Sequence, residues 1–292
     1  MNTKLVFFSA ILAALPAWAD VTPTRLPDTI VQDTTPIAEA APVGPYLQPE
    51  WTTARRFPTT RVYLQQTPWD VGVEQWVKAQ YPRGEAPNYL FQEEVELGLP
   101  GRLQADIYEN WICDKAGKVQ HDSVSAEMRW ALADWGKLPG NPTLYGEWTF
   151  RNHVLGGDKY EVKLLLGDSV TPRWHWGANF IYEQEVGAAR ATELGFSAAL
   201  SYTVIDEKLG LGGELKIESE TEHGARHLSP MEVNLGPSLQ WRPTRNIHID
   251  LNPLFGLTSD SPHVETWLVL GYDFGSGASR KEIAAPVSTR SH

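Results

Sequence analysis

Charged side chains recur at alternate positions along many short segments of this 292-residue chain, and this spacing is the first feature that could carry chemistry. In the segment 123–132, Glu127 and Arg129 alternate with Ala126, Met128 and Trp130. Successive side chains of a β-strand point to opposite sides, so the pattern predicts a ribbon with one charged and one apolar face. The charged candidates across the chain are Glu94, Glu96, Asp106, Glu127, Arg129, Glu147, Arg151, Glu161, Lys163, Glu183, Glu214, Lys216, Glu232, Arg242 and Asp250. Around one water-filled passage they would set ionic selectivity, and because acids predominate we expect a mild preference for cations.

The elements that position these charges are segments of about 10 residues, a length that crosses a bilayer when a strand is tilted. We count about 12 of them between residues 71 and 274, within a range of roughly 10 to 14, separated by turn-forming residues. Lipid offers no hydrogen-bond partners to the backbone, so such strands must close on themselves. The sequence therefore predicts an all-β fold, a single antiparallel up-and-down transmembrane β-barrel.

The alternative is a soluble β-sandwich, whose strands also alternate between apolar and polar residues. Two features favour the membrane: the connections alternate between short turns and longer polar loops, and aromatic residues collect toward strand ends. We expect Trp130, Trp135, Trp148, Trp174, Trp176, Trp241, Tyr272 and Phe274 near the short-turn end and Trp111 toward the other. The predicted aromatic girdle comprises Trp111, Trp130, Trp148, Trp174, Trp176, Trp241, Tyr272 and Phe274.

Composition excludes several other classes. Beyond the N-terminus, no apolar run reaches the roughly 18–20 residues of a membrane helix. With 25 basic against 36 acidic residues, the net charge of -11 argues against a nucleic-acid partner. A single cysteine excludes a disulfide framework and a cysteine-based zinc site.

The chain divides into four predicted parts. Residues 1–19 have a basic start, an apolar stretch and a small-x-small end (Ala17-Trp18-Ala19), typical of a secretory signal peptide. Residues 20–68 are rich in proline and show no period, which predicts a largely unstructured periplasmic lead segment. Residues 69–275 form the barrel, and residues 276–292 a flexible tail.

Catalytic and metal-binding constellations are weak in this sequence. Glu218, Glu220, Glu222, His223 and His227 cluster in one polar loop, but a solvated loop explains them as well as a metal site does. His175 and His248 fall on the charged face without a suitable serine on the lipid face. We therefore expect no enzyme activity, no cofactor and no metal.

Two segments resemble a known class. The final strand, Val269-Leu270-Gly271-Tyr272-Asp273-Phe274, resembles the assembly signal of outer-membrane proteins of Gram-negative bacteria, although 18 residues follow Phe274. The hairpin 91–104 resembles transporter-like barrels, including those associated with phenol-degradation pathways. The resemblance implies outer-membrane lipid, lipopolysaccharide, the barrel assembly machinery and a small-molecule solute as partners, with both termini periplasmic.

Three functions stay open. The first is a passive channel or transporter for small solutes. The second is a structural or interaction barrel with a plugged lumen, because a barrel of twelve strands falls between those that fill their interior and those that leave a channel. The third is an outer-membrane enzyme, which the missing constellation disfavours.

Overall fold

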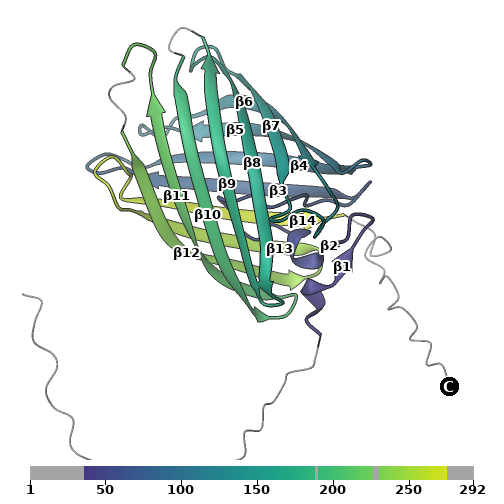
Figure 1. Cartoon of the computed structure of the whole chain (residues 1–292). Coiled ribbons are helices and arrows are strands. Elements are labelled where there is room, and N and C mark those ends of the chain that lie inside the picture. Colours follow the sequence, from purple (N-terminus) through teal and green to yellow (C-terminus); the bar gives the residue numbers. More distant parts are fainter. Residues whose placement is uncertain (1–35, 188–189, 226–229, 275–292) are drawn as a thin grey trace, which may run out of the picture. The chain divides into compact units, whose positions relative to one another are not determined.

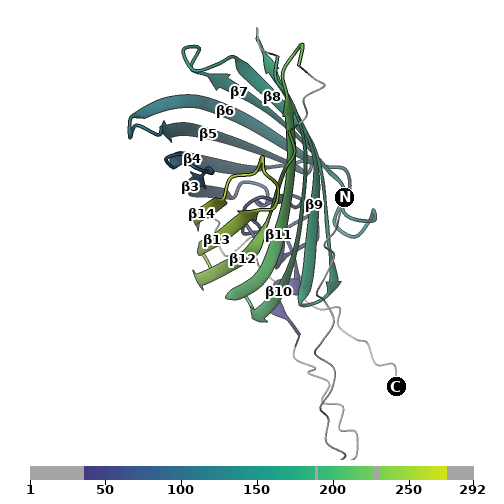
Figure 2. The same cartoon turned by 90° about the vertical axis from the view of Figure 1, so that its left-hand side faces the viewer.

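The computed structural model describes residues 36–187, 190–225 and 230–274, and its main feature is a closed barrel of twelve antiparallel strands (Figures 1 and 2). The strands are β3 (Val71–Tyr81), β4 (Asn88–Leu99), β5 (Leu103–Cys113), β6 (Val119–Ala131), β7 (Thr143–Arg151), β8 (Asp158–Thr171), β9 (Trp174–Val186), β10 (Thr192–Ile205), β11 (Leu209–Thr221), β12 (Glu232–Thr244), β13 (Ile247–Gly256) and β14 (Val264–Asp273). Each strand pairs with its neighbours in sequence, and β14 pairs with β3, with Leu268 opposite Val77. The predicted all-β class and strand number are confirmed. Among the described residues, no helix is long and apolar enough to cross a membrane.

The outer face of the barrel is apolar because one side chain of every two points outward. Its exposed side chains include Val95, Ile107, Phe150, Val162, Phe180, Leu194, Leu235 and Leu270. The strands have between 9 and 14 residues, which suffices to span the hydrocarbon layer. Exposed apolar side chains on every side of a closed sheet require lipid, and closure leaves no strand edge without hydrogen bonds.

The connections define two rims. The short-turn rim consists of residues 100–102, 132–142, 172–173, 206–208 and 245–246. The described part of the long-loop rim consists of residues 82–87, 114–118, 152–157, 187, 190–191, 222–225, 230–231 and 257–263. All connections at the short-turn rim except 132–142 have two or three residues.

Residues 36–70, here called the inner segment, fold inside the short-turn half of the barrel and at its mouth, where β1 lies (Figure 1). The segment contains the 3-10 helices η1 (Ala38–Ala40) and η2 (Glu50–Thr52) and the paired strands β1 (Pro42–Val43) and β2 (Gln48–Pro49). The prediction that residues 20–68 are largely unstructured is therefore wrong for residues 36–68. Proline-rich backbone lacks a regular period, but the barrel wall supplies its polar partners. Residues 1–35, with the predicted signal peptide, and the predicted tail 276–292 lie outside the described residues.

Both ends of the inner segment lie at the short-turn rim. The backbone amides of Ala38 and Glu39 donate to the carboxylate of Asp206, in the β10–β11 turn. At the other end, Trp69 donates to the carbonyl of Gly98, and Gly98 donates to the carbonyl of Asp70. The segment thus enters the lumen and returns to the same rim before β3 begins.

The side chains of all eight predicted girdle aromatics are half-exposed or exposed, but Trp148 lies at the other end of the barrel from the one expected. Trp148 lies opposite Tyr160, which in turn contacts Tyr182, so it belongs to the long-loop half. Trp135 lies at the short-turn rim as expected, and its ring packs edge-on against Trp51 and Tyr63 of the inner segment. The girdle role of the outer aromatics stays a prediction.

Candidate functional site: the barrel lumen

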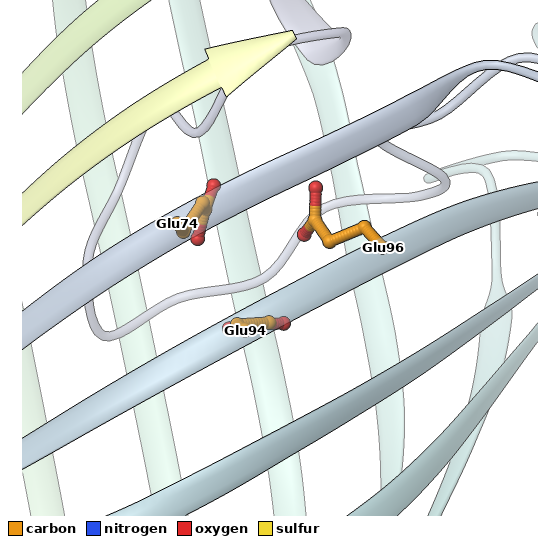
Figure 3. A group of neighbouring side chains, drawn as sticks. All are labelled: Glu74, Glu94 and Glu96. Carbon is orange, nitrogen blue, oxygen red and sulfur yellow. The ribbon is translucent and has the colours of Figure 1, made fainter. Parts of the chain in front are cut away.

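Arg55 of the inner segment lies against three carboxylates on the barrel wall. Glu74 comes from β3, and Glu94 and Glu96 come from β4, with oxygen atoms within 4.8 Å of one another (Figure 3). The Arg55 guanidinium is 2.8 Å from Glu74, 3.0 Å from Glu96 and 3.8 Å from Glu94. All four side chains are buried. Three adjacent carboxylates without a counter-charge would repel one another in a low-dielectric site, so Arg55 neutralises much of this cluster.

A second arginine of the inner segment, Arg61, continues the same arrangement toward the long-loop side. Its Nη2 atom is 3.6 Å from Glu94 and 3.7 Å from Glu127. Glu127 also pairs with Arg129 of its own strand, which reaches Asp106 at 2.9 Å. The guanidinium groups of Arg55 and Arg61 lie 4.4 and 5.3 Å from the centroid of the Trp76 ring. Charge and aromatic contacts together hold this part of the segment on β3 to β6.

Two acidic groups of the lumen have the spacing of a cation site. They are Glu74 with Glu94 and Glu96, and Glu94 with Asp106 and Glu127. Arginines already face both groups, so guanidinium ions occupy the carboxylate oxygens that would bind a cation. The two carboxylate groups are therefore explained as the sites on the barrel wall that bind the arginines of the inner segment.

Arg56 faces the opposite wall of the barrel. It donates to Ser201 and Thr203 of β10 and to Gln240 of β12, and it pairs with Glu39 at 3.4 Å. Burial raises the pKa of Glu39, but the hydrogen bond with His175 and the charge of Arg56 outweigh it and lower the pKa to about 2. Glu39 is therefore a carboxylate at neutral pH and links the start of the segment to the barrel.

Trp51 covers a chain of hydrogen bonds that lies beside the ion pair of Arg56 and Glu39. Ser169 Oγ is 3.0 Å from His175 Nδ1, and His175 Nε2 is 3.0 Å from Glu39 Oε1. This order of serine, histidine and carboxylate resembles a hydrolase triad. However, the Trp51 ring stacks on His175 at 4.5 Å and its Nε1 atom donates to Ser169. This chain of hydrogen bonds thus serves to fix Trp51 on β8 and β9.

Val62 of the inner segment fits a space left by two cross-strand glycines. Gly167 of β8 and Gly177 of β9 are directly paired. A Cβ atom at Gly167 would lie 2.5 Å from Val62 Cγ1, and one at Gly177 would lie 2.7 Å from Val62 Cγ2. Any larger residue at either position would displace the segment.

On the long-loop side of the segment the lumen opens into a cavity of about 370 Å³, here called the vestibule. Pro58, Thr59 and Arg61 form its floor. Its charged lining comprises six basic residues, Arg61, Lys78, Arg151, Lys159, Lys163 and Lys216, and six acidic residues, Asp122, Glu147, Glu161, Glu183, Glu193 and Glu218. The acidic excess that suggested a cation preference is therefore absent from the lining of this cavity.

The predicted lumen residues all lie on the inner side of the barrel, in three groups. Those at or next to the inner segment are Glu94, Glu96, Asp106, Glu127, Arg129, Glu214, Arg242 and Asp250. Those that line the vestibule are Glu147, Arg151, Glu161, Lys163, Glu183 and Lys216. Glu232 lines a separate cavity of about 290 Å³ at the long-loop rim. Their role in selectivity stays a prediction.

The prediction missed the inner-segment arginines and several lumen residues. These are Arg55, Arg56, Arg61, Glu74, Glu265, Trp76 and Trp267. A signal existed: the first four strands carry many inward acids but only Lys78 and Arg129 as inward lysine or arginine, so the wall requires cations from elsewhere. The histidine-rich loop forms no group of metal-binding spacing among its described residues, and His227 lies outside them.

Comparison with known proteins gives likeness of structure alone. No family model matches the sequence, and no curated protein does. An outer membrane channel from Pseudomonas putida F1 is similar with a TM-score of 0.51 and 12% identity, covering 73% of this chain and 97% of that one. The NanC porin has a TM-score of 0.48 and 15% identity over 69% of this chain and all of its own. The KdgM porin has a TM-score of 0.47 and 9% identity over 70% and 99% of the two chains. With its closed sheet and apolar outer face, the chain has the fold of the bacterial outer-membrane β-barrels.

Proposed function

We propose that this protein is an outer-membrane channel for small solutes, closed at rest by its own inner segment. The short-turn rim faces the periplasm, so both termini lie there, and the vestibule opens to the outside. Solutes enter the vestibule, and they cross when the inner segment withdraws from the lumen.

The observation that carries this proposal is the division of the lumen into an open and a filled half. The vestibule is a cavity inside the barrel, and its floor consists of residues of the inner segment. Arg55, Arg56 and Arg61 hold that segment mainly by ion pairs and hydrogen bonds. Polar groups of this kind regain water when they separate, whereas an apolar core would expose surface to it.

The second candidate, a structural barrel with a permanent plug, draws on the same contacts. Arg55, Arg61 and Arg129 form one buried network with the carboxylates of β3 to β6. Breaking a buried ion pair costs about 3–5 kcal/mol when one charge remains behind. The two candidates differ in whether the inner segment moves.

A reversible tether separates them. Thr60 Oγ1 of the inner segment lies 3.1 Å from Ser197 Oγ of β10, and both side chains are buried. The double variant Thr60→Cys/Ser197→Cys, made with Cys113→Ser to remove the free native thiol, places two sulfur atoms where a disulfide forms. We expect conductance in planar bilayers under reducing conditions and its loss after oxidation.

The matched control is a tether within the barrel wall. Ser125 Oγ and Thr149 Oγ1 lie 2.9 Å apart on β6 and β7, so Ser125→Cys/Thr149→Cys forms a disulfide that leaves the inner segment free. Its conductance should not depend on oxidation. Equal conductance of the first variant in both redox states would refute gating by the inner segment. Silence of every variant, including Arg55→Met, would refute the channel and leave the permanent plug.

A further inference from the structure

We propose that the vestibule is a binding site for a neutral, hydroxyl-rich solute, a monosaccharide or short oligosaccharide. This inference rests on the proposed function, because it names the solute class that the channel admits. The cavity volume of about 370 Å³ lies within the range of roughly 300–1,000 Å³ that is usual for small-molecule sites.

The first argument is that most charges of the vestibule already have partners of opposite charge. Lys163 and Glu161 are 2.5 Å apart, and Lys159 and Glu183 are 2.6 Å apart. Two more pairs, Lys216 with Glu218 at 2.8 Å and Arg151 with Asp122 at 3.3 Å, complete the charged wall on β6 to β11. An ionic solute would have to break one of these pairs or bring an unpaired charge into the lumen. A neutral solute can instead accept from the cations and donate to the carboxylates.

The second argument is that two buried polar atoms of the vestibule lining lack a hydrogen-bond partner in the described structure. Arg61 Nη1 is a donor without an acceptor, and Asn110 Oδ1 is an acceptor without a donor. Asn110 is 7% exposed, and its Nδ2 atom already donates to Ser123, which fixes the amide orientation. A hydroxyl group offers one donor and two acceptor sites, so neighbouring hydroxyls of one molecule satisfy both atoms.

The third argument is a group of apolar side chains across the barrel from the charged wall, beside Lys78. Leu90 of β4 and Trp267 of β14 line the vestibule and also an adjoining cavity of about 620 Å³, which Ile112 of β5 helps to form. These inward-facing side chains depart from the polar pattern of the lumen. The Trp267 indole is held by its Nε1 donation to Glu265 at 2.7 Å. The C–H face of a sugar ring packs against such a wall while its hydroxyls face the charged side.

Binding is tested on the purified full-length protein by ligand-detected NMR with glucose, glucuronate and glucosamine, which share one ring and differ in charge. We expect glucose to bind at least about tenfold more tightly than either charged sugar, a difference of about 1.4 kcal/mol. Tighter binding of glucuronate would overturn the inference in favour of an anion site at Arg61, and tighter binding of glucosamine would overturn it in favour of a cation site.

Two variants locate the site. Asn110→Leu removes the acceptor and should weaken glucose binding about tenfold. Asn234→Leu is the matched control, since Asn234 is also a buried lumen amide but lies outside the vestibule lining, and it should leave binding unchanged. Equal effects of the two variants would overturn the assignment. Absence of glucose binding together with conductance of the reduced tether variant would refute this inference alone. Glucose binding in a protein that never conducts would refute the channel and support the site.

Discussion

Arg55 and Glu74 meet inside the barrel with side-chain atoms 2.8 Å apart, although Arg55 belongs to the inner segment and Glu74 to the first barrel strand. Both side chains are buried, and Glu74 has Glu94 and Glu96 as neighbours. Neutralisation of the barrel wall and the position of the inner segment in the lumen therefore depend on the same contact.

Replacing Arg55 with Met should release the inner segment. The change leaves three buried carboxylates without their main counter-charge, which costs about 3–5 kcal/mol. Trypsin reports the release, because Arg56 and Arg61 are then cut while the barrel stays folded. Arg245→Met is the control, since Arg245 is 75% exposed at the short-turn rim and its pair with Glu207 contributes little. Equal trypsin resistance of the two variants would contradict the role of Arg55.

Filling the space beside Gly177 should also release the inner segment, without a change of charge. Gly177→Val places carbon atoms where Val62 lies, and overpacking of this kind costs about 1–3 kcal/mol. We expect a lower yield of the disulfide between positions 60 and 197 in the tether variant. Gly146→Val serves for comparison, because nothing lies within 4 Å of a Cβ atom at Gly146. An unchanged disulfide yield in Gly177→Val would show that the segment can shift within the lumen.

Trp51 should contribute to the closed state through packing. It is 1% exposed, stacks on His175 and meets Trp135 edge-on at 5.8 Å. Trp51→Ala should weaken docking of the segment by about 3–5 kcal/mol, measured as faster trypsin cleavage at low denaturant. Trp241→Ala, on the outer face, should leave the cleavage rate unchanged. If both variants were cut at the wild-type rate, the aromatic contacts would not hold the segment.

Docking of the inner segment should weaken in acid. The pKa of Glu39 falls from an ordinary value of 4.5 to about 2 when it faces His175 and Arg56. The contribution of Glu39 to the free energy of docking is fully present above pH 4.5. It is lost as the pH falls toward 2, because protonation then removes the negative charge of the carboxylate. Trypsin cannot be used at this pH, so pepsin cleavage within the segment is the measurement. In Glu39→Gln, cleavage should change less between pH 4.5 and 2, and an identical pH profile would exclude Glu39 as the cause.

The barrel could be predicted from sequence because each strand carries its own signal. The pattern predicts strands from residue 71 onward, where β3 begins, and the period of two predicts the inward position of Glu94, Arg129 and Lys216. Lipid imposes this pattern along every strand, so local residues suffice to reveal it.

The inner segment could not be found in this way. Its conformation depends on partners far along the chain, such as Gln240 for Arg56 and Asp206 for Ala38, and neither spacing nor hydropathy of residues 36–70 reveals them. The contacts of Trp135 escape prediction for the same reason, because its neighbours Trp51 and Tyr63 come from a segment that the sequence pattern predicts to be unstructured.

Because the inner segment starts and finishes at one rim, it lies in the lumen as a loop and does not pass through the barrel from one rim to the other. Such a loop can leave the lumen through the short-turn rim, and no chain end has to pass between the strands. In the proposed channel, opening would therefore require no separation of the β14–β3 seam and no unfolding of any strand.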